Sequence, residues 1–239
     1  MRFNQCERNW HTWKYNLFNM PPLTNPPAGS ALVCTGQDDS GIEVAHSDAL
    51  EPKNFTVEAW LKIGGFPAGD KNRQWVVSKN KSEWHLGHYA IVIRGGSVGA
   101  YINTGGGEEN SNQVWSDRGV LDAGTWHHLA LTYNGNRMAV YVDGRQVASS
   151  RVKSKRVPGE GAFAIGKRPD GYSHLRGVVD EVRVFRDALP QKAIAYHHAH
   201  PGKVQSDARG ALVRQWSFDQ GTQMGQSYRK IMNRAGPME

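Results

Sequence analysis

The sequence has no apolar run long enough to span a bilayer, and its first residues, MRFNQCERNW, lack the apolar stretch of a secretory signal. We therefore expect no membrane insertion. The chain is either not exported through such a signal, or it is part of something longer. Only two cysteines are present, Cys6 and Cys34. A disulfide between them would tie N-terminal residues to the first core strand, and the alternative is that Cys34 is a small buried apolar residue.

Several catalytic patterns are also missing. Glycoside hydrolysis needs two carboxyl groups flanking the scissile bond, and no expected strand carries two acids two positions apart. Gly105-Gly106-Gly107 has neither the lysine nor the helix start of a phosphate loop. No zinc motif or nucleophile–base triad is visible, and neighbours such as His127 and His128 point to opposite faces of a strand, so the pair cannot chelate one ion. We expect a binding protein rather than a hydrolase.

Positive charge is plentiful: the net charge is +7 and the isoelectric point is near 9.5. The basic residues concentrate in the second half, in Arg151-Val-Lys-Ser-Lys-Arg156 and then at Lys167, Arg168 and Arg176. Such a surface attracts acidic polysaccharide, nucleic acid or anionic lipid. A nucleic-acid partner would need a docking element besides charge, and none is seen. The alternative is that 151–156 is a solvated loop between strands.

The stretch from Trp126 to Gly144, WHHLALTYNGNRMAVYVDG, predicts a β-meander. Its residues alternate with a period of two on either side of Asn134-Gly135-Asn136, which tolerates the positive φ of a tight hairpin. Asp143-Gly144 is a second hairpin signal, and 146–150 would be the returning strand. A meander with one apolar face needs a second layer to cover it.

Further strands are expected throughout the chain, at 30–35, 42–45, 55–63, 75–79, 89–94, 98–103, 161–166 and 178–185. The strand 55–63 reads as half-buried, with Phe55, Val57, Ala59, Leu61 and Ile63 inward. One short helix is expected at 190–199, with Pro190 in its first turn. We expect an aromatic and proline-rich arm at 1–29, the β domain at 30–200, and a tail at 201–239 with one strand at 211–218. That strand either closes a sheet or begins another element.

These residues resemble a known family. The stretch 126–144, the strand Phe55-Thr-Val-Glu-Ala-Trp60, Ala164-Ile-Gly166 and Gly177 to Phe185 are similar, in the expected order, to laminin G-like domains of the concanavalin A-like lectin/glucanase superfamily. The resemblance covers roughly 30 to 200. It implies an all-β jelly-roll β-sandwich of two antiparallel sheets, working outside the cell or at its surface. It also implies a structural calcium, for which Asp38, Asp39 and Asp180 are the matching candidates; alternatively, Asp180 and Glu181 pair with an arginine such as Arg183.

The least generic stretch is 80–107, where a polar, aromatic and imidazole-rich loop precedes a hairpin. We expect carbohydrate to bind on the concave sheet and its rim loops, because sugars are bound by flat aromatic faces and planar polar groups. The candidate ligand-binding residues are Trp84, His85, His88, Tyr89, Tyr101 and Asn103. The resulting hypothesis is a lectin-like module for a polysaccharide or glycoconjugate, with an anionic polysaccharide favoured by the basic charge.

Two alternatives remain open. A polysaccharide lyase abstracts a proton beside a uronate carboxylate, and His88, Tyr101, Arg94 and Asn103 are residues of the types that this reaction requires. A structural or protein-binding module would need none of these groups.

Overall fold

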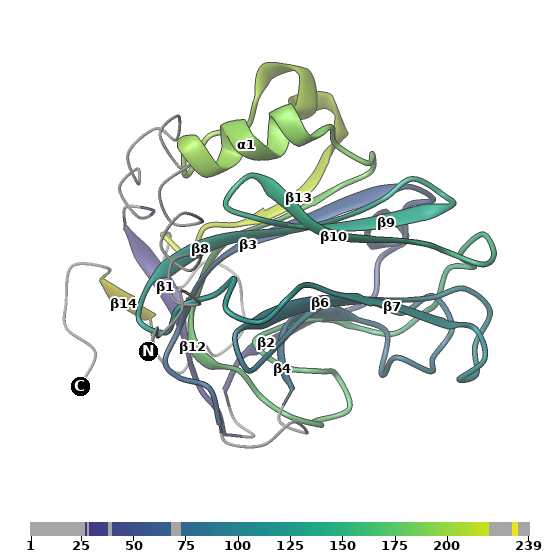
Figure 1. The fold of residues 1–239 in the computed structure, drawn as a ribbon, viewed down its shortest axis with the longest axis horizontal. Coiled ribbons are helices and arrows are strands. Elements are labelled where there is room, and N and C mark those ends of the chain that lie inside the picture. Colours follow the sequence, from purple (N-terminus) through teal and green to yellow (C-terminus); the bar gives the residue numbers. More distant parts are fainter. Residues whose placement is uncertain (1–26, 28, 38–39, 68–72, 220–230, 234–239) are drawn as a thin grey trace, which may run out of the picture.

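The computed structural model describes residues 27, 29–37, 40–67, 73–219 and 231–233. Two antiparallel sheets lie face to face, and one short helix covers the outside of one of them (Figure 1). The predicted fold class is confirmed. Of the predicted N-terminal arm 1–29, residues 1–26 and 28 lie outside the described residues. No helix of the described part is long and apolar enough to cross a membrane.

The larger sheet contains the predicted meander at one edge. Its strands follow one another in the order β10 (Arg145–Arg151), β9 (Arg137–Val142), β8 (Trp126–Tyr133), β3 (Phe55–Ile63), β12 (Arg176–Phe185), β1 (Ser30–Thr35) and β14 (Ile231–Asn233). The predicted tail strand is β13 (Leu212–Trp216), which pairs with the C-terminal half of β12, while β1 pairs with its N-terminal half. The tail strand therefore completes this sheet.

The smaller sheet is built around a second meander. Its order is β2 (Ile42–Val44), β11 (Phe163–Ile165), β4 (Gln74–Lys79), β5 (Tyr89–Arg94), β6 (Ser97–Asn103) and β7 (Ser111–Trp115). Two 3-10 turns are present: η1 (Asp48–Leu50) lies between β2 and β3, and η2 (Ser206–Ala211) lies between the helix and β13. The core fills the space between the sheets and takes every second residue of each central strand.

The strand β3 shows why burial was underestimated from sequence. Phe55, Val57, Ala59, Leu61 and Ile63 face the core as predicted. The expectation of a half-buried strand was wrong, because Thr56, Glu58 and Trp60 are buried as well. The helix α1 (Gln191–Ala199) lies across the outer face of the larger sheet (Figure 1), and its Ala193 and Ile194 pack in a second apolar cluster there.

The structure describes one of the two cysteines, Cys34. Cys34 is a buried free thiol, and burial raises its pKa to about 12. It packs against Gly166, where an added Cβ would lie 2.3 Å from the sulfur. Cys34 is thus the small buried apolar residue of the alternative reading, and Cys6 lies outside the described residues.

Candidate functional site

Strand alternation decides which predicted site residues can meet a ligand. In β5, Tyr89, Ile91 and Ile93 face the core, and Ala90 and Val92 face outward. Tyr89 is therefore not a binding residue, which corrects the prediction. Its hydroxyl donates a hydrogen bond to the Leu50 carbonyl at 2.9 Å, and burial raises the pKa of its phenol. His88 and Tyr89 are adjacent and so point to opposite faces.

The outer face of the smaller sheet carries an aromatic floor of Trp75, Tyr101 and Trp115. The Trp75 ring lies 5.7 Å from the Tyr101 ring, and Tyr101 meets Trp115 edge to face at 6.2 Å. The Trp115 indole covers Gly99, where an added Cβ would come within 2.5 Å of it. The Arg94 guanidinium lies 4.6 Å from the centre of the Trp115 ring. Aromatic floors of this kind suit the apolar faces of sugar rings.

An ion-pair network lies over this floor. Glu83 binds both Arg73, at 3.2 Å, and Arg168. Arg168 also forms a bidentate ion pair with Asp170, with both nitrogen–oxygen distances at 2.7 Å. Its guanidinium is held between two rings, 5.1 Å from buried Trp75 and 4.4 Å from Tyr172. Tyr172 is thereby stacked above the sheet with half of its surface exposed.

Beneath this network, three buried polar atoms make no hydrogen bond with any described residue: Trp75 Nε1, Ser78 Oγ and His88 Nε2. His88 Nδ1 donates to the Asn80 carbonyl at 2.7 Å, which leaves Nε2 as a hydrogen-bond acceptor. Burial lowers the pKa of His88 to about 4. The face thus offers one donor, one acceptor and one hydroxyl beside the Trp75–His88 ring contact of 5.7 Å. Buried polar groups of this kind usually bond to a partner or to water.

The rim loops expose a small group of large apolar side chains. Trp84 is 54% and Tyr172 50% exposed, and Leu86 and Val157 are also exposed. Leu86 and Val157 belong to neighbouring loops, because the Val157 carbonyl borders Gly87. The predicted residues Trp84 and His85 are therefore accessible, whereas Tyr172 was missed because a lone tyrosine in a turn gives no sequence signal.

Asn103 fills a structural role. Its amide nitrogen donates to the carbonyls of Glu83 and Gly107, and its oxygen accepts from the backbone nitrogens of Gly105 and Gly106. All of its hydrogen-bonding capacity is used to hold the two rim loops. Asn103 is not available to a ligand, and the lyase alternative loses the amide it required. Burial also raises the pKa of Tyr101, which opposes a role as a proton acceptor.

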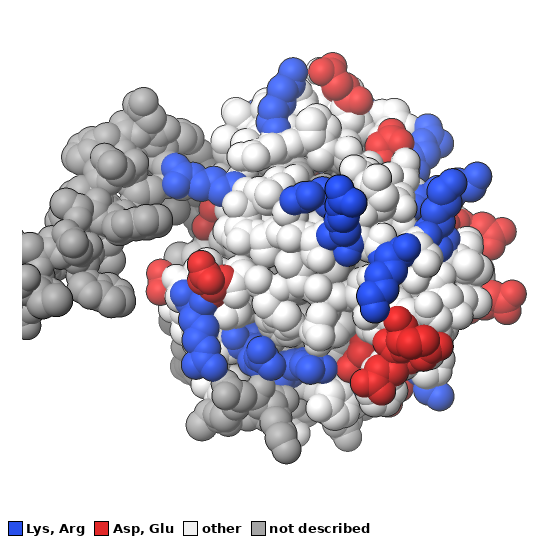
Figure 2. Space-filling model, turned by 45° about the vertical axis from the view of Figure 1, so that its right-hand side comes forward, with Lys and Arg blue, Asp and Glu red and all other residues white. Residues whose placement is uncertain are grey.

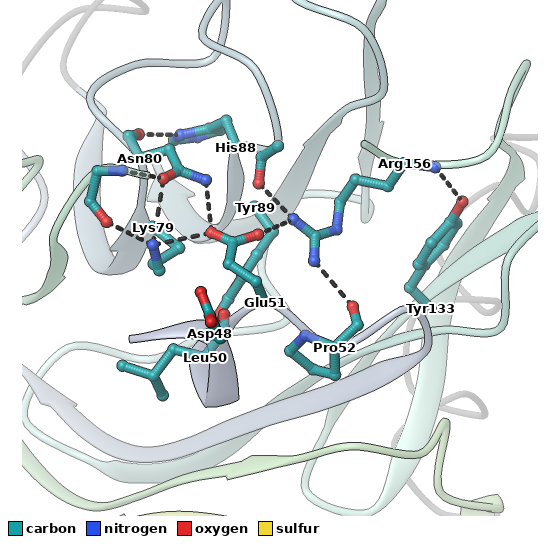
Figure 3. Close-up of polar contacts among 12 residues, drawn as sticks. Asp48, Leu50, Glu51, Pro52, Lys79, Asn80, His88, Tyr89, Tyr133 and Arg156 are labelled. Carbon is teal, nitrogen blue, oxygen red and sulfur yellow. Dashed lines mark hydrogen bonds and ion pairs between the residues drawn. The ribbon is translucent and has the colours of Figure 1, made fainter. Parts of the chain in front are cut away.

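The basic loop 151–156 is not simply solvated. Arg156 is buried and forms an ion pair with Glu51 (Figure 3), which also binds Lys79 at 2.8 Å. Arg156 further donates to the carbonyls of Gly87 and Pro52, both at 2.8 Å. Asn80, with φ at +61°, joins the cluster through its amide, which donates to Glu51 at 2.9 Å. These contacts anchor the loop between the two sheets.

A second buried network lies beneath α1. Glu58 accepts from His197 at 3.0 Å and pairs with Arg183 at 3.0 Å, and His128 lies 3.6 Å away. Burial by itself would raise the pKa of Glu58, but the hydrogen bond from His197 and the nearby ring of His128 hold this pKa well below its usual range. The adjacent pairs 127–128 and 197–198 thus face one another, because His127 and His198 both approach Asp143. Their pairing was not visible in the sequence.

The calcium prediction stays a prediction. Asp180 is fully buried in β12 and accepts a hydrogen bond from the Glu181 nitrogen, and Glu181 pairs with Arg183 at 2.7 Å. Within the described ranges, no group of three or more histidine, cysteine or acidic residues is arranged to hold a metal. Asp38 and Asp39 lie outside those ranges.

The comparisons with known proteins agree with this architecture. The family model of the laminin G-like group in the concanavalin A-like lectin/glucanase superfamily matches residues 35–195. The chain belongs to this superfamily. The matched region includes the central strands of both sheets, the first turn of α1 and the rim loops that carry Trp84 and Tyr172. No curated protein sequence matches the chain.

Solved structures show the same fold at low sequence identity. Domains LG4-5 of the mouse laminin alpha1 chain align with 15% identity and a TM-score of 0.51 over 66% of this chain and 41% of that chain. The binding domain of botulinum neurotoxin serotype G aligns with 13% identity and 0.55, covering 70% and 41%. A heptameric SAP-like pentraxin from Limulus polyphemus aligns with 14% and 0.54, covering 75% and 86%. This chain therefore spans less than half of the laminin and neurotoxin chains.

Proposed function

We propose that this laminin G-like chain is a carbohydrate-recognition module that works outside the cell or at its surface. The ligand is a polysaccharide, and the net charge of +7 favours an acidic one. It binds against the outer face of the smaller sheet and its rim loops. The observation that carries the proposal is that buried polar atoms of Trp75, Ser78 and His88 have no partner in the described part of the chain, on a face that also carries two exposed aromatic side chains.

The chemistry of that face matches a sugar. Trp84 and Tyr172 offer ring faces to the C–H groups of a pyranose, and Tyr172 is fixed by its stack on Arg168. A sugar hydroxyl both donates and accepts, so it can pair at once with the acceptor His88 Nε2 and the donor Trp75 Nε1. For these two atoms to be reached, the Glu83–Arg168 pair above them must open, which a carboxylated sugar would favour by replacing Glu83 as the partner of Arg168.

Binding without catalysis is the better reading of this face. His88, Tyr101 and Arg94 lie on it, but Asn103 is fully occupied and the pKa of Tyr101 is raised. A lyase needs a base that accepts a proton near neutral pH. Burial lowers the pKa of His88 and raises that of Tyr101, so neither of these two candidate bases has a pKa near neutral.

Affinity electrophoresis tests the proposal. The protein is run through gels cast with alginate, pectin or a neutral glucan and stained for protein and for remaining polymer. We expect retardation in at least one acidic gel with the polymer intact, and loss of retardation in Trp84→Ala/Tyr172→Ala. Val157→Ala, which removes another exposed rim side chain, is the matched control and should remain retarded.

Three outcomes overturn the proposal. A clear zone around the band would indicate polymer cleavage and support the lyase. Free migration in every gel would leave the domain as a structural or protein-binding part. Equal retardation of the wild type and the double variant would show that the polymer binds away from Trp84 and Tyr172.

A further inference from the structure

A basic cleft of about 400 Å³ opens where the β8–β9 turn meets the loop 151–156. Lys53, Asn54 and Lys155 line it, together with the turn residues 134–136. A neighbouring hollow shares Asn136 and adds Arg137 and Arg151. We propose that this basic cleft is a second binding site, which takes the sulfate or carboxylate groups of an acidic polysaccharide.

The cations of the cleft are not neutralised by the protein. Lys53, Arg151 and Lys155 form no ion pair with any residue in the described ranges, and the Arg137 guanidinium bonds to the hydroxyl of Ser149. No carboxylate is among the lining residues. Arg156 differs from these four, because Glu51 holds it in the interior. Two exposed cations in the cleft and two in the neighbouring hollow raise the local concentration of anions.

Hydrogen bonds hold the floor of the cleft in one conformation. The Asn134 side-chain oxygen accepts from the backbone nitrogen of Arg137 at 2.9 Å, and Gly135 supplies the positive φ of +95° that the turn requires. The Tyr133 hydroxyl donates to the Gly135 carbonyl at 3.0 Å and accepts from the Arg156 nitrogen at 3.2 Å. A preformed site loses less conformational entropy on binding than a mobile loop does.

The lining favours a glycan over a nucleic acid. Single-stranded nucleic acid is held by bases that stack on exposed aromatic rings, and the one ring in the cleft, that of Tyr133, is fully buried. Exposed asparagine amides beside cations suit hydroxyl and sulfate or carboxylate groups. Figure 2 shows lysine and arginine side chains spread over the face that it presents, with the largest group of acidic side chains at its lower right and others at its top and edges.

The cleft is connected to the proposed sugar face. The Val157 nitrogen donates to the Thr104 carbonyl at 3.1 Å, so the segment 151–157 runs from the cleft to the exposed rim near Leu86. The identification of the ligand as a glycan rests on the proposed function; the anion site itself rests only on the cleft. One acidic chain could therefore contact both places.

The test compares dextran sulfate with unsubstituted dextran, measured by calorimetry over a series of salt concentrations. The variant Lys53→Gln/Lys155→Gln removes two charges from the cleft, and Lys192→Gln/Lys203→Gln removes two exposed charges at α1 as the matched control. We expect the cleft variant to bind dextran sulfate roughly tenfold more weakly with a smaller salt dependence. The control should stay close to wild type, and dextran binding should be the same in all three proteins.

Equal weakening by the control would show that net charge alone attracts the polymer, and an unchanged cleft variant would show that the cleft binds nothing; either overturns the proposal. Equally tight, cleft-dependent binding of a single-stranded DNA oligonucleotide would overturn the glycan assignment. If Trp84→Ala/Tyr172→Ala binds every polymer as wild type does while the cleft variant is weakened, the proposed function fails and the second site stands.

Discussion

His88 and Tyr89 are neighbours in the chain, yet their side chains lie on opposite faces of the smaller sheet. His88 meets Trp75 on the outer face, and the Tyr89 hydroxyl binds the Leu50 carbonyl on the inner one. One residue thus belongs to the candidate site and the other to the core. The four predictions below follow from such placements.

His88 should make stability depend on pH. Its folded-state pKa of about 4 lies below the ordinary 6.5, so between these values the unfolded chain binds more protons than the folded one. The stabilisation is complete above about pH 6.5 and is lost as the pH falls toward 4, by up to about 3 kcal/mol. Urea unfolding across this range should show the loss, and His88→Gln should reduce the slope.

The matched control for that experiment is His200→Gln, at an exposed position after α1. It should keep the wild-type slope. Burial also lowers the pKa of His198, so a part of the slope should persist in His88→Gln. An identical slope in His88→Gln and wild type would contradict the assignment.

Glu51→Gln should destabilise the fold by about 3–5 kcal/mol, because it leaves the buried cations of Lys79 and Arg156 without their anion. The free energy of unfolding from urea titration measures this. Glu43→Gln is the control, since Glu43 pairs with Lys167 at the surface at 3.8 Å, and its cost should stay under about 1 kcal/mol. Similar costs for the two variants would refute the structural role of Glu51.

Gly99→Ala should displace Trp115 from the sheet, because the new Cβ would lie 2.5 Å from the indole. We expect a loss of about 1–3 kcal/mol from the strained packing and a more accessible indole, seen as stronger acrylamide quenching of tryptophan fluorescence. Gly210→Ala meets nothing within 4 Å and should leave both quantities unchanged. Unchanged quenching in Gly99→Ala would mean that Trp115 does not rest on the strand.

Glu58→Gln should loosen α1. Glu58 is the buried anion between Arg183 and His197, and His197 in turn accepts from the Gln205 nitrogen at 3.1 Å. We expect a loss of about 3–5 kcal/mol and faster hydrogen exchange in 191–199. Lys192→Ala, on the exposed side of the same helix, should change little. Protection of α1 equal to wild type would show that the helix docks without this network.

Much of the fold could be predicted from local patterns. The alternation in 55–63 and 126–133 identified two central strands, and in 55–63 also the inward side. Asp143-Gly144 identified the turn between β9 and β10. These signals work because side-chain period and turn chemistry depend on residues that are close in sequence. The strand 211–218 was also visible, but its partner was not.

Tertiary structure alone decided which outward-facing side chains are covered and which charges are paired. Glu58 is buried where His197, 139 positions away in the sequence, packs on it. Arg156 is buried because it pairs with Glu51, 105 positions away. The sequence determined the sandwich, its turns and an excess of positive charge. It did not determine the closed Arg168–Glu83 pair, the buried His88 or the open basic cleft, because burial and ion pairing depend on contacts between distant segments that no local period encodes.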